Sequence, residues 1–300
     1  MVKLAFSNKY IYQLPDGHRF PIEKYELVKE QLVYEGSVTP DQIYDPELVE
    51  EELILKIHTQ DYWNKLKTQT LDKSEVRKIG LPLTGKSLNR ARNSVAGTVT
   101  ATKNALEFGV GINLAGGTHH AYAGHGEGFC VLNDLAIASQ HLIDDFSLKQ
   151  ILIVDLDVHQ GNGTAKIFQN EPRVFTFSMH GEHNYPLRKE DSDLDVHLKN
   201  DIQDEEYIKL LTTHLQDLIR NVKPDFIFFQ AGVDVLHNDR LGKLGLTKQG
   251  VKLRDKIVIE SCKHQEIPVV ITMGGGYSER LSDLVDAHCN TFRTAISLFS

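Results

Sequence analysis

The stretch that decides the fold is ILIVDLDVH, residues 151–159. Its first four residues are aliphatic, and such a run predicts a buried strand. Because alternate residues of a strand share a face, we expect Asp155, Asp157 and His159 to point the same way. Two carboxylates and an imidazole are costly to bury without a compensating cation, and these ligand types suit Zn²⁺ and other divalent metals. A strand end where polar side chains simply meet solvent is the alternative.

Three other apolar runs end in residues able to bind a metal or a substrate: GINLAGGTHH (111–120), FIFFQAGVD (226–234) and VVITMGGGY (269–277). Taken alone, the two histidines could lie in a surface loop, Asp234 could be a helix N-cap, and the glycine run could be a flexible turn. Open α/β sheets, however, bind ligands beyond the carboxyl ends of their strands. The four endings together therefore predict one shared site.

The chain alternates such strands with amphipathic segments, which predicts an α/β fold with a parallel sheet and helices on both faces. A first strand is expected within residues 1–7. No Pro/Ser-rich linker divides residues 1–300, so we expect a single domain. The more charged stretch 13–85 should form helical additions around the rim of the site. Helices are expected over residues 88–108, 132–143, 204–222 and 247–264.

Composition narrows the classes of function. The net charge of -8 argues against a nucleic-acid-binding surface and is compatible with cationic substrates such as lysine-rich peptides or polyamines. No run of 18 apolar residues predicts a membrane helix. Three cysteines without paired spacing argue against a disulfide framework and for a cytoplasmic location. We expect Cys130 to be a small buried hydrophobe.

Five motifs follow one another along the chain: GGTHHA (116–121), GFCVLND (128–134), DLDVHQGNG (155–163), AGVD (231–234) and GGGY (274–277). Their order resembles the histone deacetylase superfamily, the zinc-dependent amide hydrolases of the arginase/deacetylase fold. The resemblance covers nearly the whole chain, and it points to the class IV branch through Gln160, Asn162, HNYP (183–186) and NDRLG (238–242).

This resemblance implies one catalytic Zn²⁺ per chain, held by Asp157, His159 and Asp234. Three protein ligands leave a position for water and substrate, as in catalytic rather than structural sites. Fe²⁺ is a second candidate ion, because oxygen and nitrogen ligands discriminate poorly between the two. Family members also hold a monovalent cation, here K⁺, with residues that match Asp155, Asp157, His159, Ser178 and Met179.

The implied reaction is hydrolysis of an acylated amine. His120 is expected to act as the general base, and His119 to orient the water and protonate the leaving amine. Tyr277 would donate a hydrogen bond to the oxyanion. Asp155 would fix the tautomer of His119. Where many relatives place a second aspartate, this chain has Asn162 beside His120, which should make His120 less basic.

The expected substrate is an acylated lysine peptide or a related acylated amine, acetylated or longer. Gly128, Phe129 and Tyr185 match positions that line the family's narrow acyl-lysine tunnel. Class IV-like members can favour long fatty-acyl chains, which requires a deep apolar cavity beyond the metal. A small-molecule deacylase such as an acetylpolyamine amidohydrolase is the main alternative.

Two further alternatives are less favoured. A dimetal ureohydrolase of the same fold needs additional aspartates two residues after His159 and two after Asp234, where this chain has Gly161 and Leu236. An inactive acyl-lysine-binding module would be indicated by loss of a metal ligand, of the histidine pair or of Tyr277. All of these residues are present.

Overall fold

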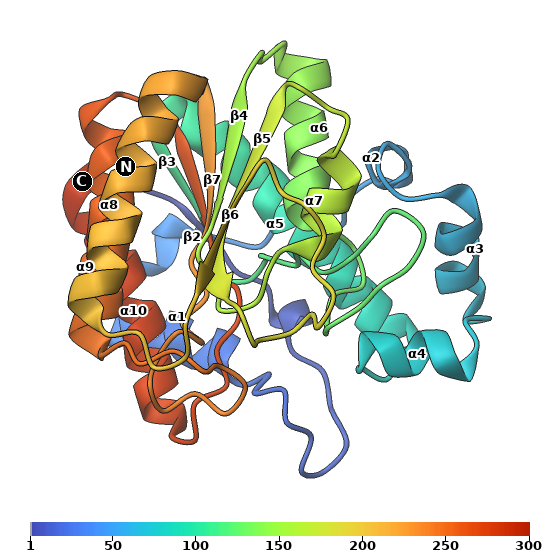
Figure 1. Cartoon of the computed structure of the whole chain (residues 1–300). Coiled ribbons are helices and arrows are strands. Elements are labelled where there is room, and N and C mark those ends of the chain that lie inside the picture. The colour runs from blue at the N-terminus through green and yellow to red at the C-terminus, as the bar shows by residue number, and fades with distance from the viewer. Residues whose placement is uncertain (1) are drawn as a thin grey trace.

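Eight parallel strands form one sheet across residues 2–300, the part of the chain that the computed structural model describes (Figure 1). The central strands are short, apolar and fully buried, as expected for a sheet covered on both faces. The spatial order is β2 (Ile43–Tyr44), β1 (Leu4–Ala5), β3 (Val110–Asn113), β8 (Val269–Thr272), β7 (Phe226–Gln230), β4 (Ile151–Asp155), β5 (Val174–Gly181) and β6 (Leu194–Leu198).

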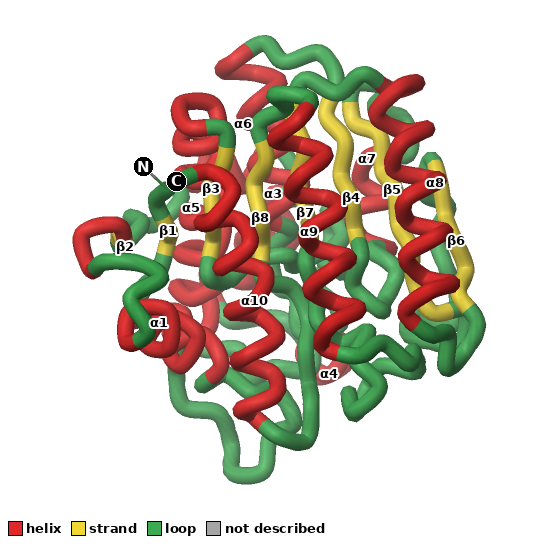
Figure 2. The backbone as a smooth tube through the Cα atoms, turned by 90° about the vertical axis from the view of Figure 1, so that its left-hand side faces the viewer, coloured by secondary structure: helices red, strands yellow, loops and turns green. Residues whose placement is uncertain are grey.

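Helices cover both faces of the sheet. Figure 2 shows α8 (Asp204–Val222), α9 (Lys248–His264) and α10 (Leu281–Phe299) in front of the strands, with α5 (Gly85–Phe108) and α6 (Asp134–Phe146) behind them. The expected α/β fold with a parallel sheet between two helical layers is therefore confirmed. The remaining helices are α1 (Lys24–Tyr34), α2 (Glu51–Leu55), α3 (Gln60–Thr68), α4 (Lys73–Ile79) and α7 (Asn162–Phe168), with 3₁₀ turns at Asn8–Tyr10 and Pro40–Gln42.

Local capping explains where the predicted helices begin and end. Helix α5 starts three residues earlier than expected, because Thr84 and Ser87 form a capping box. It stops at Gly109, whose φ of 84° lies in the left-handed region that glycine adopts readily. Asn133 caps α6 and Thr247 caps α9 through their side-chain oxygens. Helix α8 has the expected bounds.

Some elements have no clear counterpart in the sequence pattern. Strand β5 contains Thr176, Ser178 and His180 among its apolar residues, and β6 contains Asp195 and His197, so neither run was predicted. Helix α10 was also not predicted. The stretch 13–85 is largely helical, as expected, but it also contributes strand β2, and α1 packs against α10 rather than standing at the rim.

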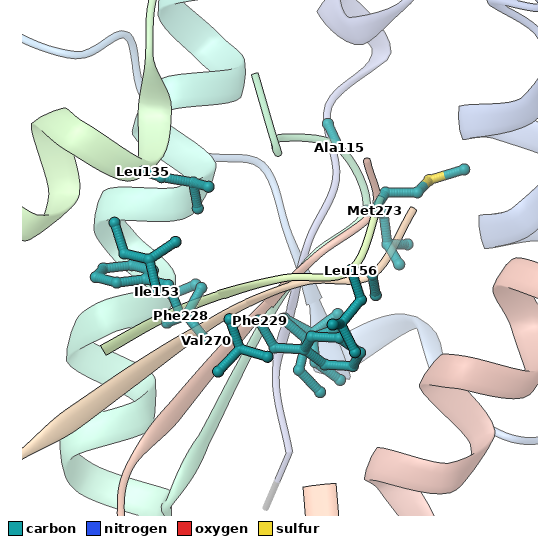
Figure 3. Close-up of a cluster of buried hydrophobic side chains, with 14 of the residues drawn as sticks. Ala115, Leu135, Ile153, Leu156, Phe228, Phe229, Val270 and Met273 are labelled. Carbon is teal, nitrogen blue, oxygen red and sulfur yellow. The ribbon is translucent and has the colours of Figure 1, made fainter. Parts of the chain in front are cut away.

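The two faces of the central strands fill the core on either side of the sheet. Phe228 and Phe229 are consecutive in β7 and point to opposite faces. Figure 3 shows Phe228 and Ile153 on the side of Leu135 from α6, with Phe229 and Leu156 on the other side. All five are buried. This packing fixes the strands, and with them the loops that follow their carboxyl ends.

Two observations bear on the class of protein. Within residues 2–300, none of the helices combines the length and the hydropathy needed to cross a membrane. Cys130, Cys262 and Cys289 are all buried with free thiols. The buried position of Cys130 agrees with its expected role in packing, and the cytoplasmic location stays a prediction.

Candidate metal and catalytic site

Three side chains that could bind a metal meet beyond the carboxyl ends of β4 and β7. Atoms of Asp157, His159 and Asp234 that could act as ligands all lie within 4.8 Å of one another, and all three residues are buried. Strand β4 ends at Asp155 rather than continuing to His159, so Asp157 and His159 stand on the following loop. The Asp155, Asp157 and His159 side chains nevertheless gather on one side, because Asp155 Oδ2 lies 2.6 Å from His119 Nδ1 and Asp157 Oδ1 lies 2.9 Å from His159 Nδ1.

The chemistry of these three residues fits a divalent cation. Asp157 Oδ2 accepts hydrogen bonds from Gly275 N–H (2.8 Å) and from the Gln230 amide (3.0 Å). Asp234 Oδ1 accepts from Val158 N–H (2.9 Å), whereas its Oδ2 is buried without a hydrogen-bond partner in residues 2–300. Burial and the Asp157 carboxylate together raise the pKa of Asp234. A bound divalent cation would relieve this repulsion and pair the orphaned oxygen.

A buried arginine, which we did not anticipate from the sequence, holds the two ligand-bearing loops together. Arg254 of α9 donates hydrogen bonds to the carbonyl oxygens of Leu156 (3.1 Å) and Gly232 (2.6 Å). Its charge is balanced by Asp255 at 2.7 Å, and both side chains are fully buried. Val251, Arg254 and Val258 follow helical spacing on one buried stripe, so the signal was a charged residue at a core-facing position.

The two adjacent histidines have different partners. His119 Nδ1 lies 2.6 Å from Asp155 Oδ2, and His120 Nδ1 lies 2.6 Å from Asn162 Oδ1. The Asn162 amide nitrogen donates to Glu127 (2.9 Å), which fixes its oxygen toward His120. His120 Nδ1 must therefore carry a hydrogen, and its Nε2 is the free basic nitrogen.

These partners also separate the pKa values of the two histidines. Burial alone would lower the pKa of His119, but Asp155 and Asp157 outweigh it and raise the pKa to about 8. Burial lowers the pKa of His120 well below its ordinary value, with further lowering from the neighbouring His119 and His159. The pKa of His119 therefore lies above that of His120, which is the order expected for an acid and a base.

Tyr277 is held in place by a loop from another part of the chain. Its backbone N–H donates to Asp239 Oδ2 (2.6 Å), and Asp239 Oδ1 accepts from Leu241 N–H and Gly242 N–H. Burial, followed by the carboxylates of Asp234 and Asp157, raises the pKa of Tyr277 well above its ordinary value. The phenol therefore remains protonated and can donate a hydrogen bond. The run NDRLG at 238–242 supplies this anchor.

A channel of about 520 Å³ leads from solvent to these residues. Gly128, Phe129 and Tyr185 line it as expected, together with His120 and Tyr277. A smaller cavity of about 40 Å³ adjoins the ligand triad itself, because Asp157 and His159 line it together with the histidine pair and Tyr277. Its lining also includes Phe20, Tyr25 and Arg90. The channel thus continues into a small cavity at the triad.

The structure brings all the other predicted site residues to the same region. Ser178 pairs with Asp155 in the register of β5 and β4, and Met179 follows it on β5. The Ser178 hydroxyl shares a hydrogen bond with His180 Nδ1 (2.9 Å). Binding of K⁺ at this position stays a prediction.

The parallel α/β sheet with carboxylate and imidazole side chains at its carboxyl edge has the arginase/deacetylase architecture that the motifs led us to expect. Residues 18–292 match the model of the histone deacetylase domain. The chain is 30% identical over 288 residues to histone deacetylase 2 of Arabidopsis thaliana, covering 92% of this chain and 74% of that protein. The chain therefore belongs to the histone deacetylase family.

Other relatives are similar over comparable lengths. An uncharacterized protein of Picosynechococcus sp. is 43% identical over 296 residues and 99% of both chains. The acetoin utilization protein AcuC of Staphylococcus aureus (strain COL) is 28% identical, covering 91% of this chain and 76% of that protein. The crystal structure of a histone deacetylase homologue complexed with SAHA superimposes with a TM-score of 0.85 at 24% identity, covering 99% of this chain and 84% of that one.

Proposed function

We propose that this chain is a deacylase with one bound divalent cation, expected to be Zn²⁺ with Fe²⁺ as the alternative, that removes short acyl groups from amines. The observation that carries the proposal is the convergence of the Asp157, His159 and Asp234 triad with a histidine pair and Tyr277 at the end of one channel. The family of the chain supports hydrolysis of acylated amines, and acyl-lysine side chains are the first substrate class to test.

Each residue at the floor of the channel has a separate role in the proposed hydrolysis. Asp157, His159 and Asp234 would hold a divalent cation, which would supply Lewis-acid polarisation of the acyl carbonyl and lower the pKa of bound water. Neutral His120 accepts a proton from the attacking water through its free Nε2, and protonated His119 donates one to the leaving amine. The Tyr277 phenol donates a hydrogen bond to the acyl oxygen as negative charge develops. Asp155 keeps the His119 ring oriented.

The size of the inner cavity supports short acyl groups rather than the long fatty-acyl chains that the resemblance raised. The cavity at the triad measures about 40 Å³, and a bound cation and the acyl group would share it. Arg90 in its lining is also a poor neighbour for a hydrocarbon chain. We expect kcat/KM to fall from acetyl- to octanoyl- to myristoyl-lysine in one peptide, and a rise with chain length would contradict this proposal.

The testing experiment is a turnover assay of the purified protein on acetyl-lysine peptides, acetylpolyamines and guanidino compounds, each with and without chelator. We expect metal-dependent release of acetate from peptides. Release of urea with two Mn²⁺ ions would favour the ureohydrolase alternative, and faster cleavage of acetylpolyamines would favour the small-molecule one. Saturable binding of acetyl-lysine peptide without turnover in the metal-loaded protein would indicate a binding module. We also propose that the chain belongs to the class IV branch of the family and that it is located in the cytoplasm.

A further inference from the structure

The mouth of the channel has the opposite sign of charge from the molecule as a whole. The chain carries a net charge of -8. Among the described residues that line the outer channel, four are cationic and none is an aspartate or glutamate. The four are Arg19, Arg77, Lys78 and Lys243, and we call them the basic rim.

Three of the four rim charges are free to meet a substrate. Lys78 pairs with Glu127 at 2.6 Å and is largely neutralised. Arg19, Arg77 and Lys243 are exposed, and within residues 2–300 none has a carboxylate oxygen within 4.0 Å. The Arg19 guanidinium lies 5.0 Å from the centroid of the Phe129 ring, which fixes it beside the channel wall. Lys243 is held by the carbonyl oxygen of His183 at 2.9 Å.

Nearby acidic side chains do not cancel the rim. Glu127 is buried and also receives hydrogen bonds from Asn162 and Tyr185. Asp16, Glu23 and Glu279 line a neighbouring cavity, shared with Arg19, His18 and Arg240. The channel mouth itself therefore keeps its positive charge, and the field there repels cations and attracts anions.

We propose that the preferred substrate carries a carboxylate close to its acylated amine, placed to meet Arg19, Arg77 and Lys243. This inference rests on the proposed deacylase function and specifies its substrate. It departs from the cationic substrates, lysine-rich peptides or polyamines, with which the net charge is compatible, because those cations would face the basic rim. The carboxylate belongs either to acidic residues beside the acyl-lysine of a peptide or to a small acylated amino acid. Arginine pairs with both through two parallel hydrogen bonds.

The first experiment compares acetyl-lysine peptides that differ only in their flanking residues, with aspartate, alanine or lysine on both sides. We expect kcat/KM to fall in that order, by about tenfold from the aspartate to the lysine peptide at low salt, mainly through KM. The difference should shrink at about 0.5 M salt, where the screening length is only a few ångströms. Acetyl-lysine with a free carboxylate, its carboxamide and acetylspermidine form the small-molecule arm, expected to be cleaved in that order. Faster cleavage of the aspartate peptide would assign the carboxylate to residues beside the acyl-lysine of a peptide. Faster cleavage of free acetyl-lysine would assign it to a small acylated amino acid.

The second experiment reverses one rim charge. Arg77→Glu in the last turn of α4 should lower kcat/KM for the aspartate peptide by about two- to fivefold and raise it for the lysine peptide, with Arg77→Gln in between. Lys103→Glu is the matched control, because Lys103 is exposed on α5 toward the sheet edge where β3 begins, away from the channel. It should change neither peptide.

The two proposals fail in different ways. Hydrolysis of all peptides at equal rates, or preference for the lysine-flanked peptide or acetylspermidine, would overturn the carboxylate inference and leave the deacylase function standing. Absence of hydrolysis for every acylated peptide and amine by metal-loaded protein would overturn both.

Discussion

The floor and the mouth of the channel both carry charged side chains, but those at the floor are buried and those at the mouth are exposed to solvent. At the floor, Asp155, Asp157 and Asp234 are buried and gathered against imidazoles and backbone amides. At the mouth, Arg19 and Arg77 remain in water. Buried charges demand compensation, so the floor is suited to hold a cation beside groups that can exchange protons. Solvated charges contribute little each, so the mouth selects among substrates without deciding whether the reaction occurs.

The largest expected effect comes from removing the charge of one metal ligand at the floor of the channel. Asp157→Asn should lower metal content and reduce kcat by about 10³-fold or more, because the cation supplies several kcal/mol of charge stabilisation. Metal content by elemental analysis and kcat on an acetyl-lysine peptide measure the two effects. Asp61→Asn, at an aspartate with a side chain 80% exposed, is the control and should change neither. Full turnover in a metal-poor Asp157→Asn protein would contradict the assignment.

Removal of the Tyr277 hydroxyl tests oxyanion stabilisation at the floor of the channel without changing a metal ligand. Tyr277→Phe should keep the fold and the metal but lose about 10²–10³ in kcat, because the lost hydrogen bond matters only once the oxyanion develops. The measurement is kcat beside metal content and melting temperature. Near-normal turnover in a metal-replete protein would leave Tyr277 as a packing residue.

The buried arginine behind the floor should have a smaller effect on the ligands it positions. Arg254→Lys keeps the charge but cannot reach the carbonyls of Leu156 and Gly232 with the same fork, so metal affinity should fall by about 10- to 100-fold. Arg254→Met leaves Asp255 as an unpaired buried charge and should destabilise the fold by about 3–5 kcal/mol. Metal titration of the folded Arg254→Lys protein separates the two effects. Unchanged affinity there would assign Arg254 to packing alone.

The smallest expected effect is a shift in pH dependence. Asn162→Asp places a carboxylate against His120 Nδ1 and should raise the pKa of His120, which burial now keeps low. Because His120 acts in its neutral form, a higher pKa means that activity is lost at a higher pH on the acid side. The acid limb of kcat/KM should therefore move up by about one pH unit or more. An unchanged limb would indicate that His120 is not the base.

The sequence predicted the floor better than the mouth, for a physical reason. Buried strands and their polar endings are encoded locally, so Asp157, His159 and Asp234 could be placed at one sheet edge from alternation and strand order. The basic rim comes from two loops and one short helix, and no local pattern relates Arg19 to Lys243. Global net charge was therefore a poor guide to the sign of charge at the mouth.

The residues that position the catalytic side chains were also harder to predict from the sequence than the catalytic side chains themselves. The pairing of Asp155 with His119 could be expected from family resemblance, but the anchoring of Tyr277 by Asp239 depends on how two loops meet in space. Strand β6 alternates apolar and polar residues, but it was missed because the alternation spans only five residues of a partly exposed edge strand. Arg254 was missed because a charged residue on an apolar stripe is explained only by the carbonyls that it reaches.

The most direct test of the account is a metal titration of chelator-treated protein, followed by kcat on an acetyl-lysine peptide and by elemental analysis. If Asp157, His159 and Asp234 form a single catalytic metal site, activity should be absent without metal and should saturate at about one equivalent of Zn²⁺ or Fe²⁺ per chain. Full activity in metal-free protein, or saturation only at two equivalents of Mn²⁺, would contradict the account.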